Sequence, residues 1–173
     1  MIQSDDCILV KAADVVTDEI SGDVYKAGSR TARVVYSPHA SIMVTTRTPG
    51  YHSRASAHEG DELDYCVSGE MLIFVGDKGY QVCAGDFIRI RGGAMHWALV
   101  SGDTPCTMMH VHTPPFVGNA GAADTAFAAL FGGERKGEFP IAKDIFDHDF
   151  PTDGVEKAYF AAEAASAAGA HAK

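Results

Sequence analysis

A dense series of short apolar runs between residues 36 and 115 limits what this chain can fold into. The runs are rich in β-branched and aromatic residues, and glycine, aspartate or proline stands between them, as expected for strands joined by turns. They comprise residues 41–46, 62–67, 71–75, 80–83, 87–90, 97–100 and 107–111. Because no helical segment interrupts the series, we expect an all-β sandwich or barrel. Gly76-Asp77-Lys78-Gly79 predicts a hairpin turn between two of these strands.

The 173 residues suffice for one domain with a buried core. We predict a single domain made of an N-terminal arm (1–35), a β-barrel (36–115) and a C-terminal extension (116–173). The alanine-rich residues 156–168 favour a helix in the extension.

A shorter helix is expected earlier in the extension, where Asp124 can cap its start and Gly132-Gly133 can end it. Phe127, Leu130 and Phe131 recur there at helical spacing. Because leaving large apolar groups in water is unfavourable, we expect the extension to cover the barrel mouth or a dimer surface.

The charge of the chain excludes some classes of partner. Fourteen Lys and Arg residues against twenty-three Asp and Glu residues give a net charge of −9, whereas nucleic acids and anionic membranes need a basic surface. No apolar run approaches the roughly 20 residues that cross a bilayer, and the acidic start lacks the pattern of a signal peptide. We therefore predict a soluble, cytoplasmic protein with a small-molecule substrate and no nucleic-acid or membrane partner.

The four cysteines predict no metal or redox motif. Cys7, Cys66, Cys83 and Cys106 lie far apart and include no Cys-x-x-Cys pair. In a reducing compartment we expect them to be free thiols that pack as small apolar groups.

The chemically informative residues lie within the β-rich region. Residues two apart share one face of a strand, so His52, Arg54, Ser56 and His58 are expected on a common face. Glu62 begins the next strand after a Gly-Asp turn. His96 opens a later strand after a second turn that contains two glycines.

This pattern resembles the cupin superfamily, whose members are small jelly-roll barrels with two signature motifs. The first motif reads His-x-His, three residues, Glu, six residues, Gly, and the second reads Gly, five residues, Pro-x-Gly, two residues, His, three residues, Asn. Here they are matched by His58, Glu62 and Gly69, and by Gly85, Gly93 and His96. The resemblance covers about residues 45–113 and implies a cupin jelly-roll β-barrel with a partly helical C-terminal extension, assembled as a homodimer.

Three positions depart from the cupin motifs. Arg91 and Val100 replace the proline and the asparagine of the second motif, which are structural positions. Ser56 stands where the first motif has its first histidine, and this change removes one metal ligand.

The resemblance implies one divalent transition metal per chain, held by His58, Glu62 and His96. Two histidines and one carboxylate leave several coordination positions open, as in non-haem Fe(II) oxygenases, so we favour Fe(II). The same ligands would suit Zn, Ni or Mn acting as a Lewis acid. The alternative is a cupin that has lost its metal.

Further residues are candidates for contact with a substrate. His110 and His112 share one face of the expected last strand: if it points inward, His110 is the candidate catalytic acid or base and His112 a substrate contact, and if outward both are surface residues. Arg54 could hold a carboxylate or phenolate, or form a surface salt bridge. Ser56 could widen the pocket or bond to a substrate. His52 is a further substrate-contact candidate, and only a bend between residues 53 and 57 would bring it to the metal.

The leading functional prediction is a mononuclear Fe(II) dioxygenase acting on a small chelating phenolic or dicarbonyl-type substrate. The first alternative is a non-redox metal enzyme, either a lyase, an isomerase or a polyketide-type cyclase. The second is a small-molecule-binding cupin without catalysis.

Overall fold

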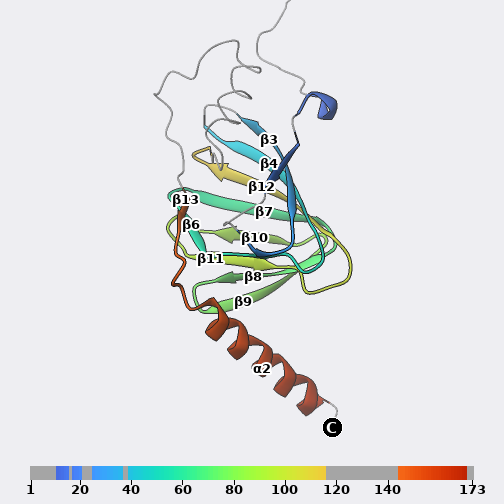
Figure 1. Ribbon diagram of the computed structural model, residues 1–173, viewed down its shortest axis with the longest axis vertical. Helices are drawn as coiled ribbons and strands as arrows, with labels where there is room; N and C mark the ends of the chain where they lie inside the picture. The colour runs from blue at the N-terminus through green and yellow to red at the C-terminus, as the bar shows by residue number, and fades with distance from the viewer. Residues whose placement is uncertain (1–10, 16, 21–24, 37–38, 116–143, 171–173) are drawn as a thin grey trace, which may run out of the picture.

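The structure is a computed structural model that describes residues 11–15, 17–20, 25–36, 39–115 and 144–170. Two antiparallel sheets enclose the interior, and one helix leaves the barrel at its C-terminal end (Figure 1). The all-β jelly-roll expected from the sequence is therefore confirmed. No helix among the described residues has the length and apolar character to span a membrane. The cytoplasmic location and the homodimer stay predictions.

The first sheet supplies most of the polar residues discussed below. Its strands, in spatial order, are β1 (Asp18–Ile20), β3 (Arg30–Tyr36), β4 (Ser41–Arg47), β12 (Cys106–Thr113), β7 (Asp61–Ser68) and β10 (Phe87–Ile90). Strands far apart in the chain lie side by side here, since β12 pairs with β4 on one side and with β7 on the other.

The second sheet faces the first across the interior. It runs in the order β13 (Asp144–Phe146), β6 (Ser56–His58), β11 (His96–Leu99), β5 (His52–Ser53) and β2 (Tyr25–Ala27). The hairpin of β8 (Glu70–Val75) and β9 (Lys78–Cys83) joins it through β11. Val75 pairs with Lys78 across a two-residue turn, which confirms the predicted hairpin.

The N-terminal region contributes strands to both sheets. A short 3-10 helix (Ala12–Asp14) precedes β1, which pairs with β3, while β2 pairs with β5 of the second sheet. Part of the predicted N-terminal arm (1–35) thus forms strands of the two sheets.

Two apolar clusters pack on either side of the second sheet. Inside the barrel, Met71 and Ile73 of β8 join a buried cluster with Tyr51 and Met108. On the outer face, Leu72 and Phe74 of the same strand pack with Ala55 and Trp97. Strand β8 is buried on both faces because the C-terminal helix covers this outer surface.

Helix α2 (Thr152–Ala170) covers the outer face through its first two turns. Val155 and Tyr159 pack against the outer cluster, and the Tyr159 ring meets Phe74 edge-on at 5.5 Å between centroids. Beyond this contact residues 160–168 are exposed, and Figure 1 shows the helix running away from the barrel beside β8 and β9. The predicted helix at 156–168 is confirmed and starts earlier, whereas the helix predicted from Asp124, with Phe127, Leu130 and Phe131, lies outside the described residues.

Two turns bring the expected metal ligands together. Gly93 has φ +77°, a backbone conformation that side chains other than glycine rarely adopt, and its N–H donates to the His58 carbonyl at 2.7 Å. The glycine turn before β11 is thereby held against the end of β6, so His96 begins its strand next to His58. Gly92 makes a similarly close approach, since a Cβ there would lie 2.3 Å from the Glu59 carbonyl oxygen.

Candidate metal centre

Three strands direct donor atoms to one point inside the barrel. His58 ends β6, Glu62 lies near the start of β7, and His96 begins β11. His58 Nε2 lies 2.9 Å and His96 Nε2 lies 3.5 Å from the same oxygen, Oε2 of Glu62. One donor atom from each residue lies within 4.8 Å of the others. Two ligands that are each about 2.1 Å from a metal are themselves about 3.0–3.4 Å apart, so this spacing suits a single ion.

Backbone carbonyls set the protonation of both imidazoles. His58 Nδ1–H donates to the Gly60 carbonyl at 2.8 Å, and His96 Nδ1–H donates to the Ala94 carbonyl at 2.9 Å. Each neutral ring therefore presents the lone pair of Nε2 to a carboxylate that also carries lone pairs. Only a cation or an added proton stabilises such an arrangement, and the carbonyl partner is the usual one for a metal-binding histidine. These residues fit a divalent transition metal.

The charges of the ligands agree with this assignment. Burial opposes the ionisation of Glu62, but hydrogen bonds from His110 and His112 outweigh it and hold the pKa of Glu62 well below its usual range. Burial lowers the pKa of His96, which keeps its imidazole neutral. A carboxylate and neutral imidazoles are the forms that bind metals.

The buried histidines of β12 settle the orientation of that strand. Residues 106, 108, 110 and 112 are all buried, so His110 and His112 both point into the barrel and not outward. His112 lies opposite Glu62 across β12 and β7, with its Nε2 3.5 Å from Oε1 of Glu62. The two oxygens of Glu62 thus face different partners, Oε2 towards His58 and His96, and Oε1 towards β12.

His110 forms a buried hydrogen-bond network that sequence reasoning captured only in part. Its Nδ1–H is shared between Glu62 Oε1 at 2.8 Å and Asp64 Oδ1 at 2.7 Å. Burial and the charge of Glu62 raise the pKa of Asp64 to about 7. On the other side, Nη1 and Nη2 of Arg47 both lie 3.3 Å from His110 Nε2, and Thr45 Oγ1 lies 3.0 Å from it. Because a guanidinium can only donate, Nε2 accepts and His110 is held as its Nδ1–H tautomer.

Asp64 and Arg47 were not among the predicted site residues. Asp64 stands two positions after Glu62, and Arg47 ends the alternating buried face of β4. The alternation of side chains along each strand was the available signal, but Arg47 lies outside the two motifs and Asp64 occupies a position that the first motif leaves unspecified.

Comparison with known proteins identifies a known domain family within the barrel. Residues 43–112 match a family model described as "Cupin domain". This part of the chain is a cupin domain. No curated protein matches it in sequence.

Several solved structures share the fold at low sequence identity. The polyketide cyclase RemF from Streptomyces resistomycificus has a TM-score of 0.56 at 15% identity, over 84% of this chain and 89% of that one. A predicted oxalate decarboxylase from Thermotoga maritima has a TM-score of 0.54 at 20% identity, over 62% and 99% of the two chains. An RmlC-like cupin from Shewanella frigidimarina has a TM-score of 0.53 at 16% identity, over 61% and 88%. These similarities establish the fold and leave the reaction open.

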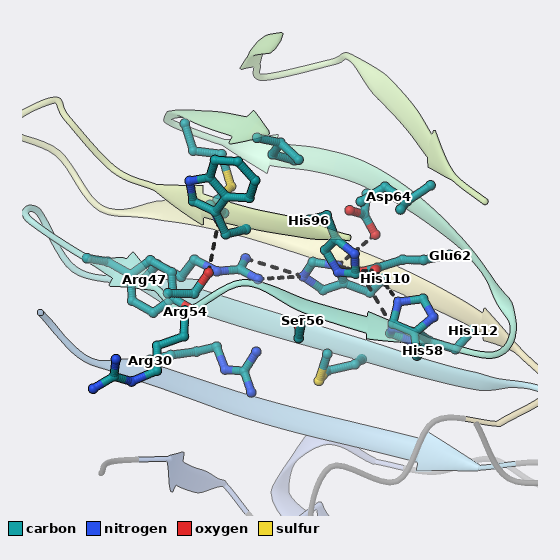
Figure 2. A pocket seen from close by; sticks show the side chains of 18 residues that line it. Arg30, Arg47, Arg54, Ser56, His58, Glu62, Asp64, His96, His110 and His112 are labelled. Atoms are coloured by element: carbon teal, nitrogen blue, oxygen red, sulfur yellow. Dashed lines mark hydrogen bonds and ion pairs between the residues drawn. The ribbon is translucent and has the colours of Figure 1, made fainter. Parts of the chain in front are cut away.

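The cupin pocket has two chemically distinct ends. Figure 2 shows the histidines and acidic residues gathered at one end, with Arg30, Arg47 and Arg54 at the other and Ser56 between them. Arg54 and Ser56, two predicted substrate contacts, both line this pocket.

His52 is placed differently from the sequence prediction. The pocket is lined by Ser53 and Arg54 and not by His52, whose Nε2 lies 3.0 Å from Glu156 Oε1 on α2. The alternation assumed from His52 to His58 is interrupted, because β5 ends at Ser53 and β6 begins only at Ser56. His52 therefore faces the helix on the outside of the sheet, and we remove it from the candidate substrate contacts.

Proposed function

We propose that this cupin is a mononuclear metal-dependent enzyme, an Fe(II) dioxygenase acting on a small chelating phenolic or dicarbonyl-type substrate. The observation that carries the proposal is the convergence of His58 Nε2 and His96 Nε2 on one carboxylate oxygen of Glu62. Two histidines and one carboxylate form the donor set typical of non-haem Fe(II) oxygenases. When bound, the iron would supply open coordination positions at which a chelating substrate and dioxygen meet.

Ser56 supports an open site. It lies opposite His96 across β6 and β11, and both residues line the pocket. A hydroxymethyl group is much shorter than an imidazole, so position 56 leaves room for a substrate where a fourth histidine would stand.

The residues around the ligands would bind the substrate and move protons. Asp64 accepts a hydrogen bond from His110 Nδ1–H beside Glu62, so its carboxylate can accept a proton from a phenol or an enolisable ketone as the substrate binds. Arg54 would orient the substrate through its planar guanidinium. Met43, Met71 and Ile73 line the pocket and would exclude water from the bound molecule.

The Asp64–His110 pair also favours a second candidate, a non-redox lyase, isomerase or cyclase. A buried acid–base pair next to a metal ligand suits removal of a proton α to a carbonyl. In that reaction the metal would act as a Lewis acid, and zinc, nickel or manganese would serve.

Metal analysis combined with oxygen consumption tests the proposal. The protein is purified without chelator and its metals are quantified, then oxygen uptake is followed with catechol and with acetylacetone as probes. One equivalent of iron per chain with substrate-dependent oxygen uptake supports the dioxygenase. Zinc, nickel or manganese without oxygen uptake overturns it in favour of the non-redox enzyme, and the absence of any bound metal favours a binding protein.

A further inference from the structure

Arg47 is a buried cation at the end of the pocket opposite the metal ligands. It closes β4, lines the pocket and is 6% exposed. Nη1 donates to Thr45 Oγ1 at 2.7 Å, and the guanidinium carbon lies 5.4 Å from the centre of the Tyr51 ring. Together with the two contacts to His110 Nε2, these interactions hold the guanidinium in one orientation.

The charge of Arg47 has no direct counter-ion in the described part of the chain. None of the described carboxylates forms a salt bridge with it, and its Nε is buried without a hydrogen-bond acceptor. Burying a cation without an anion beside it is costly, and proteins rarely do so unless a partner supplies the charge. A buried, oriented guanidinium that lines a pocket therefore points to an anionic ligand.

The remaining charges of the pocket favour the same class of ligand. Arg30 and Arg54 line the arginine end and are only partly buried, so they add positive potential near the opening. Glu62 and Asp64 are the acidic residues of the lining, and Glu62 would be neutralised by a metal cation. The pocket would then carry an excess of positive charge, which attracts an anion.

The geometry favours a carboxylate over a phosphate ester. Arg47 provides one deeply buried charge, which matches a singly charged group, and its planar fork matches the two oxygens of a carboxylate. The His110 ring separates Arg47 from Glu62, because its Nε2 faces the guanidinium and its Nδ1 faces the carboxylate. A ligand that contacts both the metal and Arg47 therefore has its anionic group and its chelating oxygens on opposite sides of one ring.

We propose that Arg47 binds the carboxylate of the substrate, so that the enzyme acts on small organic acids whose chelating oxygens lie one ring away from that carboxylate. Arg30 and Arg54 assist as neighbouring cations. This assignment rests on the proposed function for the chelating end of the substrate, whereas the carboxylate end depends on the arginines alone.

Binding of a matched pair of probes tests the proposal. The probes are 3,4-dihydroxybenzoate and 3,4-dihydroxybenzamide, which share the catechol and differ in the charge of the group opposite it. Titrations are followed by calorimetry, because the ring of the only tryptophan, Trp97, lies on the outer face of the sheet against Phe74 and Glu156. With chelator-treated, metal-free protein we expect the acid to bind at least tenfold more tightly than the amide, because charge-assisted hydrogen bonds exceed neutral ones by about that factor.

Substitutions assign the preference to particular arginines. Arg47→Met should reduce the acid-over-amide ratio to near one, and Arg47→Lys should retain part of it, since charge is kept and the fork is lost. Arg54→Gln keeps the test decisive if Arg47→Met fails to fold, and it should lower the ratio severalfold. Arg33→Met is the matched control, because Arg33 lies on β3 with Arg30 but is exposed and bonds to Thr17. It should leave the ratio unchanged.

Three results would overturn the proposal. The first is equal affinity of the metal-free protein for the acid and the amide. The second is an unchanged acid-over-amide affinity ratio in well-folded Arg47→Met and Arg54→Gln variants. The third is displacement of the acid by inorganic phosphate at a concentration tenfold below that of the acid. None of these depends on metal. A protein that binds no metal but keeps the arginine-dependent preference contradicts the proposed function and not this assignment.

Discussion

Ser56 lies directly opposite His96, across the antiparallel pair of β6 and β11. Both side chains line the pocket, and His96 presents its Nε2 to Glu62 at 3.5 Å. The position at which the cupin motif has its first histidine is therefore adjacent to the three remaining ligands, although serine occupies it.

Ser56→His should restore a fourth ligand. We expect metal affinity to rise by about tenfold or more, because another imidazole would be added to a preformed set of donors, and activity to fall as an open coordination position is filled. Affinity is measured by competition with a chelating dye, and Ser56→Ala is the control that changes the side chain without adding a donor. An affinity of Ser56→His equal to that of the control would show that residue 56 does not face the metal.

His96→Ala should abolish stoichiometric metal binding. Removal of this imidazole leaves His58 and Glu62, and two ligands hold a divalent ion weakly compared with three. Metal content per chain after dialysis gives the readout. His148→Ala, which removes an exposed histidine from the turn before α2, should keep full occupancy. Full occupancy of the His96→Ala protein would mean that the ligand assignment is wrong.

The strands and the ligand set were predictable because both follow local sequence rules. Seven strands of the barrel were located to within one or two residues, since turn residues bound each apolar run. His58, Glu62 and His96 converge because the motif spacing fixes the turns that position them. The two strand pairs that bring β12 between β4 and β7 involve distant residues, and no local pattern predicts them.

The other residues of the site could not be predicted, because the usual alternation of buried apolar and exposed polar side chains is reversed there. Strands normally bury apolar residues and expose polar ones. In β4 and β7, Thr45, Arg47 and Asp64 are buried, whereas Ile42 and Leu63 are each 47% exposed. A hydrophobic pattern therefore suggests the wrong inward face, and the orientation of His110 and His112 could not be derived from it. Such a reversal is expected where a barrel interior holds a polar site and not a core.

The buried cysteines should resist alkylation. Burial and the neighbouring Cys66 thiol raise the pKa of Cys106 to about 12, and burial raises that of Cys66. A pKa above the pH of the reaction keeps the thiol protonated, and the thiolate is the reactive form. At pH 8, iodoacetamide should modify the exposed Cys83 within minutes and leave Cys66 and Cys106 unmodified, as measured by peptide mass spectrometry. Equal modification of Cys106 and Cys83 in the native protein would contradict this burial.

The C-terminal segment should stabilise the barrel through its first helical turns. Truncation after Gly133 removes β13 and α2, and exposes the face on which Phe74 stacks on Trp97 at 5.0 Å between ring centres. It also removes the Glu156 carboxylate that accepts from the Trp97 indole N–H at 2.8 Å. Each large apolar side chain that loses its cover costs about 1.5–3 kcal/mol.

We therefore expect the truncation after Gly133 to lower the melting temperature by about 10 °C or more, since each kcal/mol is worth about 2–4 °C in a chain of this size. Trp97 emission should shift to longer wavelength, because this 1% exposed ring would become hydrated. Truncation after Ser166 is the matched control: it removes only the end of the helix, where residues 160–168 are exposed, and should leave both values unchanged. If the two truncated proteins melt at the same temperature as the full chain, the segment is a passive appendage and its packing on β8 contributes nothing to stability.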